Sequence, residues 1–320
     1  MKDVVAVGEL LADMVEKGVS PEGSPVFEAN PGGAPLNFLA ALSRYGCGTA
    51  MIGCVGDDAL GRMLVSALEK YGVDGSFVSV TGAAFTTMAF VTLGSRGERE
   101  FSFARKPGAD TMIDLAKLPC EAIRGAKYLH FGTLSLTSEP ARSATMAAVS
   151  LAKSSGVLVS FDPNYRAALW DSEDEARRRM IWGFGAADFI KAGADELEFA
   201  LGVDFRSAAR QLVRNGSSLV LATDGERGGF FCAAGTEGDY SAFRVEHTVD
   251  TTGAGDIFGG AALCRIIRSG KALRELGGRE LREAVRFAGA AAALSSEKYG
   301  GAPSIPDERD VLTFLSSQPE

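Results

Sequence analysis

The stretch VDTTGAGDIFGGAALCRIIRSG, residues 249–270, decides the fold, because a turn rich in glycine and threonine leads there directly into a helical pattern. Apolar residues return every three or four positions after the turn, which is typical of a helix packed against a core. The first amides of a helix lack partners within it and lie at the positive end of its dipole, so they bind anions. We therefore predict an anion hole formed by the amides of Gly253, Ala254 and Gly255.

Asp256 follows these glycines directly. Aspartate is common as a helix cap, so in isolation it would indicate only where the helix begins. Here the carboxylate lies beside a predicted phosphate-binding turn, and phosphoryl transfer to a hydroxyl uses a base next to the transferred group. We therefore predict that Asp256 is a general base.

Short apolar runs alternate with amphipathic segments in the rest of the chain. Buried strands are predicted at VVAVGEL, TAMIGCVG, KYLHFGTL, VLVSFDP, DFIKAG and SLVLATDG. Helices are predicted at residues 35–46, 59–72, 139–156 and 172–186. Strands that alternate with helices favour an α/β fold, in which a mostly parallel, Rossmann-like central sheet is flanked by helices.

Two segments interrupt this alternation. Residues 85–104 contain two strand-like runs around the turn Gly94–Gly97, which predicts a hairpin. Residues 9–30 contain another pair of short extended pieces separated by Gly, Ser and Pro. We expect both excursions to pair into a small sheet that acts as a lid, formed by about 9–30 and 85–108 of a single domain that spans 1–320.

Charge and composition indicate a small-molecule partner. The chain has 33 basic and 41 acidic residues, and a net charge of -8 disfavours attraction to nucleic acid or to an anionic membrane surface. The N-terminus lacks the basic flank and apolar core of a signal peptide, and no apolar run reaches the roughly 20 residues of a membrane helix. We expect a cytoplasmic protein whose five cysteines are reduced thiols, since none forms a C-x-x-C pair.

Two motifs resemble signatures of the ribokinase-like (PfkB) carbohydrate kinases. Residues 250–256, DTTGAGD, resemble the C-terminal signature of that family, and residues 30–37, NPGGAPLN, with the following IGCVGDDALGRML, resemble the first one. The resemblance extends over the full length of the chain, and two signatures in the right order are specific. It implies a ribokinase-like fold and an ATP-dependent sugar kinase that uses Mg²⁺.

The resemblance also implies the sugar-binding residues. In the family an early aspartate, a glycine pair and an asparagine hold the sugar hydroxyls, and these match Asp13, Gly32, Gly33 and Asn37. Polar side chains next to a Gly-Gly turn suit a polyol. Without the resemblance, Asp13 could equally be a solvated charge at the end of a strand.

The nucleotide site is implied by the turn after the strand SLVLA. Thr223, Gly225 and Gly228 are similar to the family's T-x-G-x-x-G turn, which admits the ribose and phosphates. Asp224 stands where many relatives have an apolar residue, and Gly289 occupies a place near adenine that is often Asn. These departures are expected to affect nucleotide affinity.

The cation sites are implied in the same way. Lys191 and Glu196 match the region where the family's glutamate orders magnesium through water, although Gly193 replaces the usual Asn or Ser. A carboxylate near a helix start also has a purely structural explanation in the helix dipole. A site for K⁺ is implied by Asp250, Thr252 and the loop 299–304, and the sequence leaves open whether potassium is required.

Within the family the resemblance is greatest to bacterial fructokinases, through GELLADM and the segments 103–110, 130–142 and 161–170. It predicts phosphorylation of D-fructose to fructose 6-phosphate. Four further residues are expected near the sugar or the phosphates: Arg105 from the lid, Glu139 on the pocket floor, Asn164 and Arg166.

Three alternatives stay open. Arg105 and Arg166 would also suit the carboxylate of 2-keto-3-deoxygluconate, so a kinase for that acid sugar is the second hypothesis. A catalytically silent sugar-binding regulator could use the same fold, although the intact Asp256 argues against it. A dinucleotide-binding oxidoreductase is disfavoured, because the turn after the first strand lacks the glycine fingerprint. The lid is expected to pair with a second copy in a homodimer.

Overall fold

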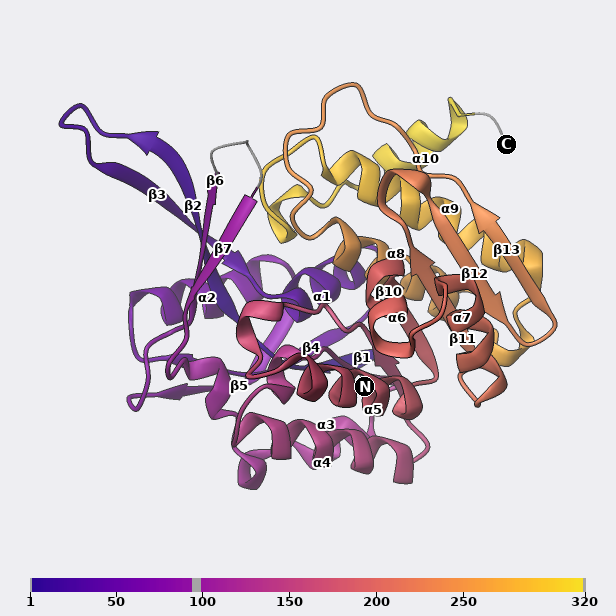
Figure 1. The fold of residues 1–320 in the computed structure, drawn as a ribbon, viewed down its shortest axis with the longest axis horizontal. Helices are drawn as coiled ribbons and strands as arrows, with labels where there is room; N and C mark the ends of the chain where they lie inside the picture. Colours follow the sequence, from indigo (N-terminus) through magenta and orange to yellow (C-terminus); the bar gives the residue numbers. More distant parts are fainter. Residues whose placement is uncertain (1, 94–98, 319–320) are drawn as a thin grey trace.

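The computed structural model describes residues 2–93 and 99–318. It contains a nine-stranded sheet of order β13-β12-β11-β10-β9-β8-β1-β4-β5 and a four-stranded sheet of order β3-β2-β6-β7 (Figure 1). The strands are β1 Val4–Val7, β2 Leu11–Val19, β3 Pro25–Gly32, β4 Thr49–Gly56, β5 Val73–Thr81, β6 Met88–Leu93, β7 Arg99–Ala104, β8 Tyr128–Phe131, β9 Leu158–Phe161, β10 Phe189–Gly193, β11 Leu219–Thr223, β12 Gly229–Ala233 and β13 Thr236–Tyr240.

Helices cover both faces of the large sheet. They are α1 Ala34–Arg44, α2 Ala59–Lys70, α3 Cys120–Arg124, α4 Ala141–Ser154, α5 Glu173–Ala186, α6 Ala194–Leu201, α7 Phe205–Arg214, α8 Ala254–Arg268, α9 Gly278–Ser295 and α10 Glu308–Ser316. One hydrophobic cluster joins α1, α2, α8, α9 and α10 to the sheet, and a second joins α3 to α7 to its other face. Figure 1 shows α3, α4 and α5 below the sheet and α8 and α9 above it.

The apolar runs form strands because both of their faces are buried. Along β1, Val4 and Ala6 belong to one cluster, whereas Val5 and Val7 belong to the other. The side chains of a strand alternate between its faces, so a strand covered on both sides has to be apolar throughout. The six predicted strands and the four predicted helices are all present, and neighbouring strands from β11 to β5 run parallel. The α/β prediction is confirmed.

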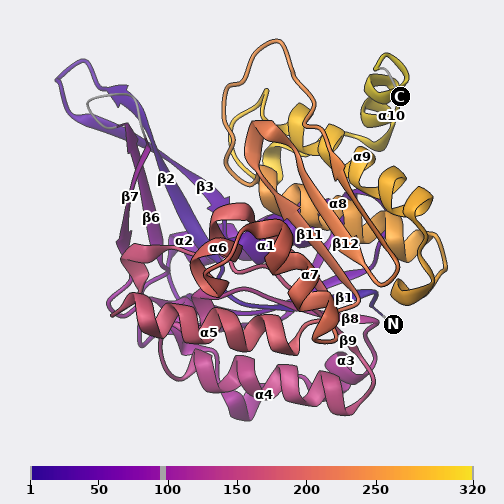
Figure 2. The same cartoon turned by 45° about the vertical axis from the view of Figure 1, so that its right-hand side comes forward.

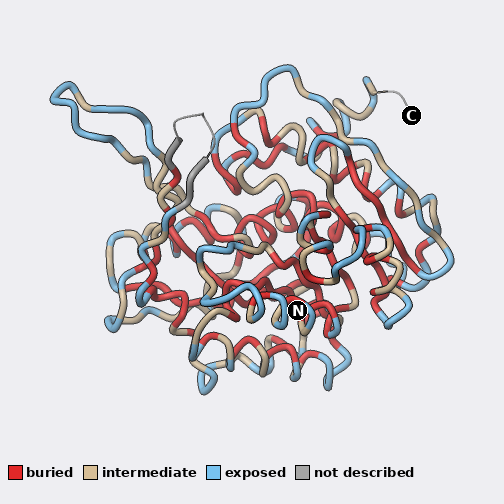
Figure 3. The backbone as a smooth tube through the Cα atoms, viewed as in Figure 1, coloured by how far each residue is buried: buried red, intermediate tan, exposed pale blue. Residues whose placement is uncertain are grey.

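The small sheet is also confirmed. The β6–β7 hairpin is antiparallel, and β2 pairs in parallel with β6 and antiparallel with β3. The predicted turn Gly94–Gly97 lies outside the described residues. In both ribbon views the small sheet projects from the body of the molecule (Figure 1, Figure 2), and the tip of its β2–β3 hairpin is exposed (Figure 3).

Polar residues follow the carboxyl ends of the parallel strands, among them Asn164 and Thr223, which were predicted to bind ligands. Glu9 lies just after β1, Asn164 just after β9, and Thr223 ends β11. The carboxyl ends of parallel strands meet at one edge of a sheet, which is where α/β proteins bind ligands. Within the described residues, no helix has the length and apolar character to cross a membrane.

Candidate active site

Asp256 lies in the first turn of α8, and Gly253 rather than Asp256 is the N-cap. The Asp256 side chain is buried, and its two oxygens accept hydrogen bonds of 3.0 Å from Asn37 Nδ2 and Asn164 Nδ2. Burial raises the pKa of the Asp256 carboxyl above its ordinary value, while the Lys191 charge and the bond from Asn37 oppose the shift. A buried carboxylate with a raised pKa, held by fixed donors, is suited to accept a proton.

The two asparagines are themselves held in place. Asn37 Oδ1 accepts a hydrogen bond of 2.9 Å from the Ala302 amide, so the orientation of its amide group is defined from both sides. Asn164 has a φ of 43°, in the left-handed region that asparagine tolerates better than most residues. The conformation directs Asn164 Nδ2 to Asp256, and residues from three distant parts of the chain meet there.

A cavity of about 430 Å³ opens beside Asp256, between the two sheets. The small sheet contributes Leu11, Asp13, Ala89 and Phe103 to its lining, and the large domain contributes Gly33, Asn37, Asn164, Arg166 and Lys191 among others. Asp13, Gly33 and Asn37, three of the residues predicted to bind the sugar, therefore line one cavity. The cavity mixes apolar walls with hydrogen-bonding groups, which is the usual character of a small-molecule site.

Asp13 and the glycine pair form one unit of this cavity. Gly32 packs so closely on the Asp13 carboxylate that any Cβ there would collide with it. Gly33 has a φ of 109°, and a Cβ would lie 2.6 Å from the Glu9 carbonyl oxygen. Burial and the nearby charge of Asp256 raise the pKa of Asp13 to about 7. The glycines thus allow Asp13 to lie against the backbone and face the cavity.

The turn 251–255 separates this cavity from a second one of about 460 Å³. Thr251 and Gly255 line both cavities, while Gly253 lines the first and Ala254 the second. The predicted anion hole therefore stands where two ligands would meet. A chemical group transferred between ligands in the two cavities would lie beside the amides at the start of α8, next to Asp256.

The residues of the predicted nucleotide turn line the second cavity. Thr223, Gly225, Gly228 and Gly289 all line it, with Tyr240 and Phe243 providing aromatic walls. A Cβ on Gly289 would lie 3.5 Å from the Phe243 ring, an ordinary van der Waals distance. Asp224 is turned away to pair with Arg227. The departure at Asp224 therefore adds no charge to the cavity lining.

Lys191 and Glu196 lie in the first cavity, where a phosphate chain would approach Asp256. Lys191 Nζ is 3.0 Å from Asp162 Oδ2, and both side chains are buried. Burial alone lowers the pKa of Lys191, but the charges of Asp162, Glu196 and Asp256 outweigh it and raise the pKa. Lys191 is therefore a buried cation, and its Nζ packs against the anion-hole turn, 2.9 Å from where a Cβ on Gly255 would lie.

Asp162 was not predicted from the sequence as a functional residue. Its signal was available, because a charged residue directly after a buried strand marks the ligand edge of the sheet.

The donor atoms near Glu196 suit a magnesium ion that is bound largely through water. Glu196 accepts hydrogen bonds from the amides of Tyr165 and Gly193, each at 2.7 Å. Among the described residues, no three His, Cys, Asp or Glu side chains gather closely enough to hold a metal. Mg²⁺ commonly takes one or two carboxylates, several waters and the substrate phosphates, so Asp162, whose buried Oδ1 has no hydrogen-bond partner, and Glu196 fit that requirement.

Asp250 connects the two segments that were predicted to bind potassium. Its carboxylate accepts hydrogen bonds from the amides of Thr252, at 2.7 Å, and Gly300, at 2.9 Å. The loop after α9 is thereby fastened to the start of the anion-hole turn. The residues implied for a monovalent cation are neighbours in space.

Arg105 is absent from the lining of the first cavity, contrary to the prediction that it reaches the sugar. It is 9% exposed, and its guanidinium donates to Asp110 Oδ2 at 2.8 Å, Thr137 Oγ1 at 2.7 Å and the Leu134 carbonyl at 2.9 Å. The partner Asp110 is fully buried. Leaving the buried Asp110 carboxylate without a cation would cost free energy, so the Arg105 guanidinium pairs with it and does not extend into the cavity.

Glu139 is likewise outside the cavity. Its carboxylate accepts a hydrogen bond of 3.1 Å from the Ser143 amide at the start of α4, and the side chain is 55% exposed. A carboxylate at a helix N-terminus satisfies free amides and the dipole. The expectation that Glu139 faces the pocket floor is therefore corrected, whereas Asn164 and Arg166 do line the cavity.

Glu9 lines the first cavity, and it too was not predicted from the sequence as a functional residue. It is 2% exposed, its Oε1 accepts a 3.0 Å hydrogen bond from the Ala34 amide at the start of α1, and its Oε2 has no partner among the described residues. Burial raises the pKa of Glu9 to about 8, and the charge of Asp110 adds to the shift. Glu9 is therefore a neutral acid at pH 7.

The neutral state of Glu9 predicts how the free energy of unfolding depends on pH. The folded protein keeps the Glu9 proton between the ordinary pKa of 4.5 and about 8, whereas the unfolded chain releases it, so wild-type stability falls as the pH rises through this window. Glu9→Gln remains neutral and keeps the acceptor for Ala34. We expect the variant to gain about 3–5 kcal/mol relative to wild type between pH 5 and pH 8.5.

The measurement is urea unfolding of both proteins at the two pH values, with the exposed Glu69→Gln as the matched control. A pH dependence that is the same in wild type, Glu9→Gln and Glu69→Gln would show that Glu9 is not held neutral.

Comparison with known proteins identifies the family. The family model described as "pfkB family carbohydrate kinase" matches residues 1–308. The chain belongs to this family. Its relatives include Fructokinase-1 of Oryza sativa subsp. japonica, 42% identical over 98% of both chains, and Probable fructokinase-2 of Arabidopsis thaliana, 42% identical over 99% of this chain and 97% of the relative. This pfkB kinase is an ATP-dependent carbohydrate kinase.

Solved structures agree with this assignment. A fructokinase with bound ATP from Xylella fastidiosa has a TM-score of 0.90 and 28% identity over 100% of both chains. A fructokinase double mutant from Vibrio cholerae O395 with fructose, ADP and potassium bound has a TM-score of 0.86 and 28% identity over 98% of both chains. The ribokinase-like fold of this pfkB kinase is therefore confirmed.

Proposed function

We propose that this kinase transfers the γ-phosphoryl group of ATP to the 6-hydroxyl of D-fructose, with Asp256 as the general base. One observation carries the proposal: the buried Asp256 carboxylate stands where two cavities meet, beside the amides that begin α8. The neighbouring sugar and nucleotide would then present hydroxyl and phosphate from opposite sides. Relatives over nearly the whole chain are named fructokinases, which supports the choice of sugar.

In the proposed reaction, Asp13, the Gly32–Gly33 turn and Asn37 hold the sugar, and Asp256 takes the proton of the attacking hydroxyl. The amides of Gly253, Ala254 and Gly255 stabilise the negative charge that develops on the transferred group. Lys191 and Arg166 supply positive charge beside the phosphates. The nucleotide occupies the second cavity, against Thr223, Gly225, Gly228 and Gly289.

Magnesium bound with ATP would neutralise negative charge on the phosphates. Glu196 would hold it through water, with Asp162 nearby. A monovalent cation, K⁺, would lie near Asp250 and Thr252. We also propose that 1–320 is one kinase domain whose small sheet closes over the sugar, and that the enzyme is a cytoplasmic homodimer that pairs through this sheet.

Charge favours a neutral sugar over 2-keto-3-deoxygluconate. The described lining of the sugar cavity contains the carboxyl groups of Asp13, Asp195, Glu196 and Asp256, besides the neutral Glu9, and its cations are Lys191 and Arg166. Lys191 is paired with Asp162, and Arg105 is engaged elsewhere. An acid sugar would therefore bring its carboxylate to a surface in which acidic groups predominate, whereas fructose brings only hydroxyls.

The test is a coupled ADP-release assay with fructose and with 2-keto-3-deoxygluconate, in wild type and Asp13→Asn. We expect kcat/KM to be higher for fructose. At about pH 8, above the pKa of about 7 of Asp13, its carboxylate is charged. A hydrogen bond to a charged group contributes about 1.5–3 kcal/mol, so at this pH Asp13→Asn should raise the KM for fructose about 10- to 100-fold and leave the KM for ATP largely unchanged.

Glu28→Gln, on the same small sheet but exposed, serves as the matched control and should behave as wild type. A wild-type preference for the acid sugar would overturn the fructose assignment, and ATP turnover without any sugar would overturn the assignment of the first cavity.

A further inference from the structure

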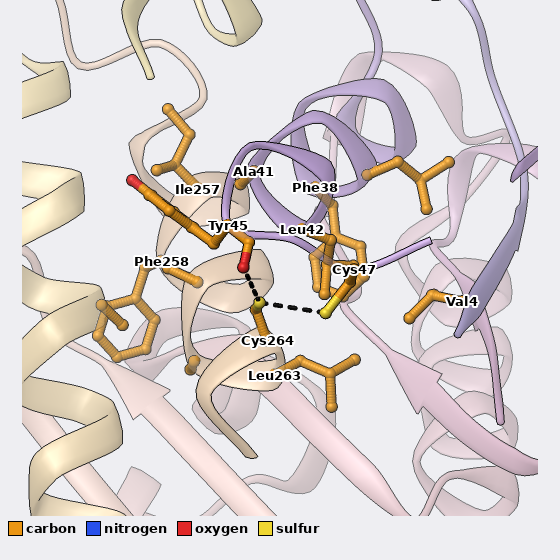
Figure 4. Close-up of a cluster of buried hydrophobic side chains, with 14 of the residues drawn as sticks. Val4, Phe38, Ala41, Leu42, Tyr45, Cys47, Ile257, Phe258, Leu263 and Cys264 are labelled. Carbon is orange, nitrogen blue, oxygen red and sulfur yellow. Dashed lines mark hydrogen bonds between the residues drawn. The ribbon is translucent and has the colours of Figure 1, made fainter. Parts of the chain in front are cut away.

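Two buried cysteine sulfurs are in contact beneath the active site. Cys47 Sγ lies 3.1 Å from Cys264 Sγ, although the residues are 217 positions apart in the chain (Figure 4). Cys47 lies between α1 and β4, and Cys264 lies on α8, two turns beyond Asp256. Both are almost fully buried, with exposed fractions of 5% and 0%. The proposed phosphoryl transfer uses neither thiol.

The surroundings distinguish the two sulfurs. Cys264 Sγ donates to the Tyr45 carbonyl at 3.2 Å, and Arg268 donates to the same oxygen at 3.0 Å. The hydrogen bond with Cys264 lowers the pKa of the Cys47 thiol, and the charges of Arg268 and Lys127 lower it further. The same hydrogen bond and burial raise the pKa of Cys264. Cys47 is therefore the thiol that ionises first and the better nucleophile of the pair.

The other three cysteines lack such a partner. Cys54 Sγ contacts the Val55 carbonyl, Cys232 Sγ contacts Glu237, and Cys120 is exposed at the start of α3. Cys120 is accessible but stands alone, so it provides a natural comparison for effects of simple exposure.

We propose that Cys47 and Cys264 form a reversible oxidation site, in which a small peroxide converts the two thiols into an intramolecular disulfide. The Cys47 thiolate attacks one peroxide oxygen and becomes a sulfenic acid, and the leaving hydroxide takes up a proton as water. Cys264 then attacks the oxidised sulfur, the S–S bond forms, and a second water leaves. The two thiols lose two hydrogens in total, and the peroxide is reduced to two waters.

The geometry requires only a small movement. A disulfide is about 2.05 Å long, so the sulfurs have to approach by about 1 Å. The burial that shields the pair admits a small peroxide more readily than a bulky oxidant. A dithiol reductant reverses the reaction by thiol–disulfide exchange.

The bond would tie together the two elements that hold the catalytic base. α8 carries Asp256 in its first turn, and the segment with Cys47 follows α1, which carries Asn37. α1 and α8 pack side by side within one hydrophobic cluster. A cross-link that closes a long loop restricts the unfolded chain strongly. The oxidised enzyme should therefore resist heat inactivation.

The experiment treats the full-length protein with a slight excess of hydrogen peroxide and then measures intact mass, free thiols and the peptides linked under non-reducing conditions. Wild type and Cys120→Ser should lose the mass of two hydrogens and yield one linked pair, Cys47 with Cys264. The free thiols of wild type should fall from five to three, and dithiothreitol should restore all five. Cys47→Ser and Cys264→Ala should form no such link.

The half-life of kinase activity at a denaturing temperature gives the second readout. Oxidation should lengthen it several-fold in wild type and in Cys120→Ser, and not in Cys47→Ser. Peroxide treatment that leaves Cys47 and Cys264 as thiols, or that oxidises only Cys120, would overturn the proposal. A linked protein whose half-life is unchanged would overturn the stabilising role. The peptide map of wild type decides the first point even if a variant fails to fold.

Discussion

Asp256→Asn is expected to lower kcat about 100-fold or more, while ATP binding remains nearly intact. Attack by a neutral hydroxyl requires removal of its proton, and an amide cannot accept it. The substitution keeps the shape of the side chain. It also disturbs the local hydrogen bonds, because Asn37 Nδ2 and Asn164 Nδ2 both donate to Asp256, and an amide offers only one acceptor oxygen.

A matched variant separates these two effects. Asn164→Ala removes one donor but leaves the base, so it should reduce kcat far less than Asp256→Asn. The measurements are kcat at saturating sugar and ATP, and ATP affinity by calorimetry. Near-normal turnover in Asp256→Asn, or equal losses in the two variants, would contradict the assignment of Asp256 as the base.

Gly253→Ala is expected to lower kcat by about 100- to 1000-fold, the loss typical of an anion hole in which one donor no longer points at the developing charge. Gly253 has a φ of 75°, and a Cβ there would lie 2.6 Å from Gly301 Cα and 3.1 Å from Asn37 Nδ2. The methyl group would push apart the turn, the loop after α9 and the asparagine that holds Asp256. Backbone strain and a displaced base would then act together.

Gly270 provides the matched control, because it lies just beyond the other end of α8 with a φ of 71°, and a Cβ added there would have no atom of the described residues within 4 Å. Gly270→Ala carries the same kind of backbone strain without a collision, so it should lose some stability and retain kcat. Thermal unfolding and steady-state kinetics of both variants test this. Comparable kinetic losses in both would mean that strain alone explains the effect at Gly253.

Sequence patterns predicted some features of this fold and site and missed others. The glycine turn, Asp256 and the helix that follows are contiguous, so local chemistry was sufficient to predict them together. Six strands of the large sheet and the helices α1, α2, α4, α5 and α8 could be predicted, because burial on two faces requires continuous apolar runs and burial on one face requires a helical period. The helices α3, α7, α9 and α10 were not predicted. The strands β5, β12 and β13 were missed: β5 and β13 are partly exposed, and β12, although apolar and buried, follows β11 after a short turn.

The sequence by itself determined the alternation of strands and helices, the hairpin β6–β7 and the motif that contains the proposed anion hole and base, because each depends on neighbours within a few residues. The pairing of β2 with β6 joins distant parts of the chain and depends on the tertiary structure. Only the tertiary structure decided what meets Asp256: Asn37 reaches it from 219 positions away and Asn164 from 92. It also decided where long side chains point. Arg105 turns inward because the buried charge of Asp110 requires a partner, and Glu139 caps a helix, since packing and unpaired backbone groups determine such directions only once the chain has folded.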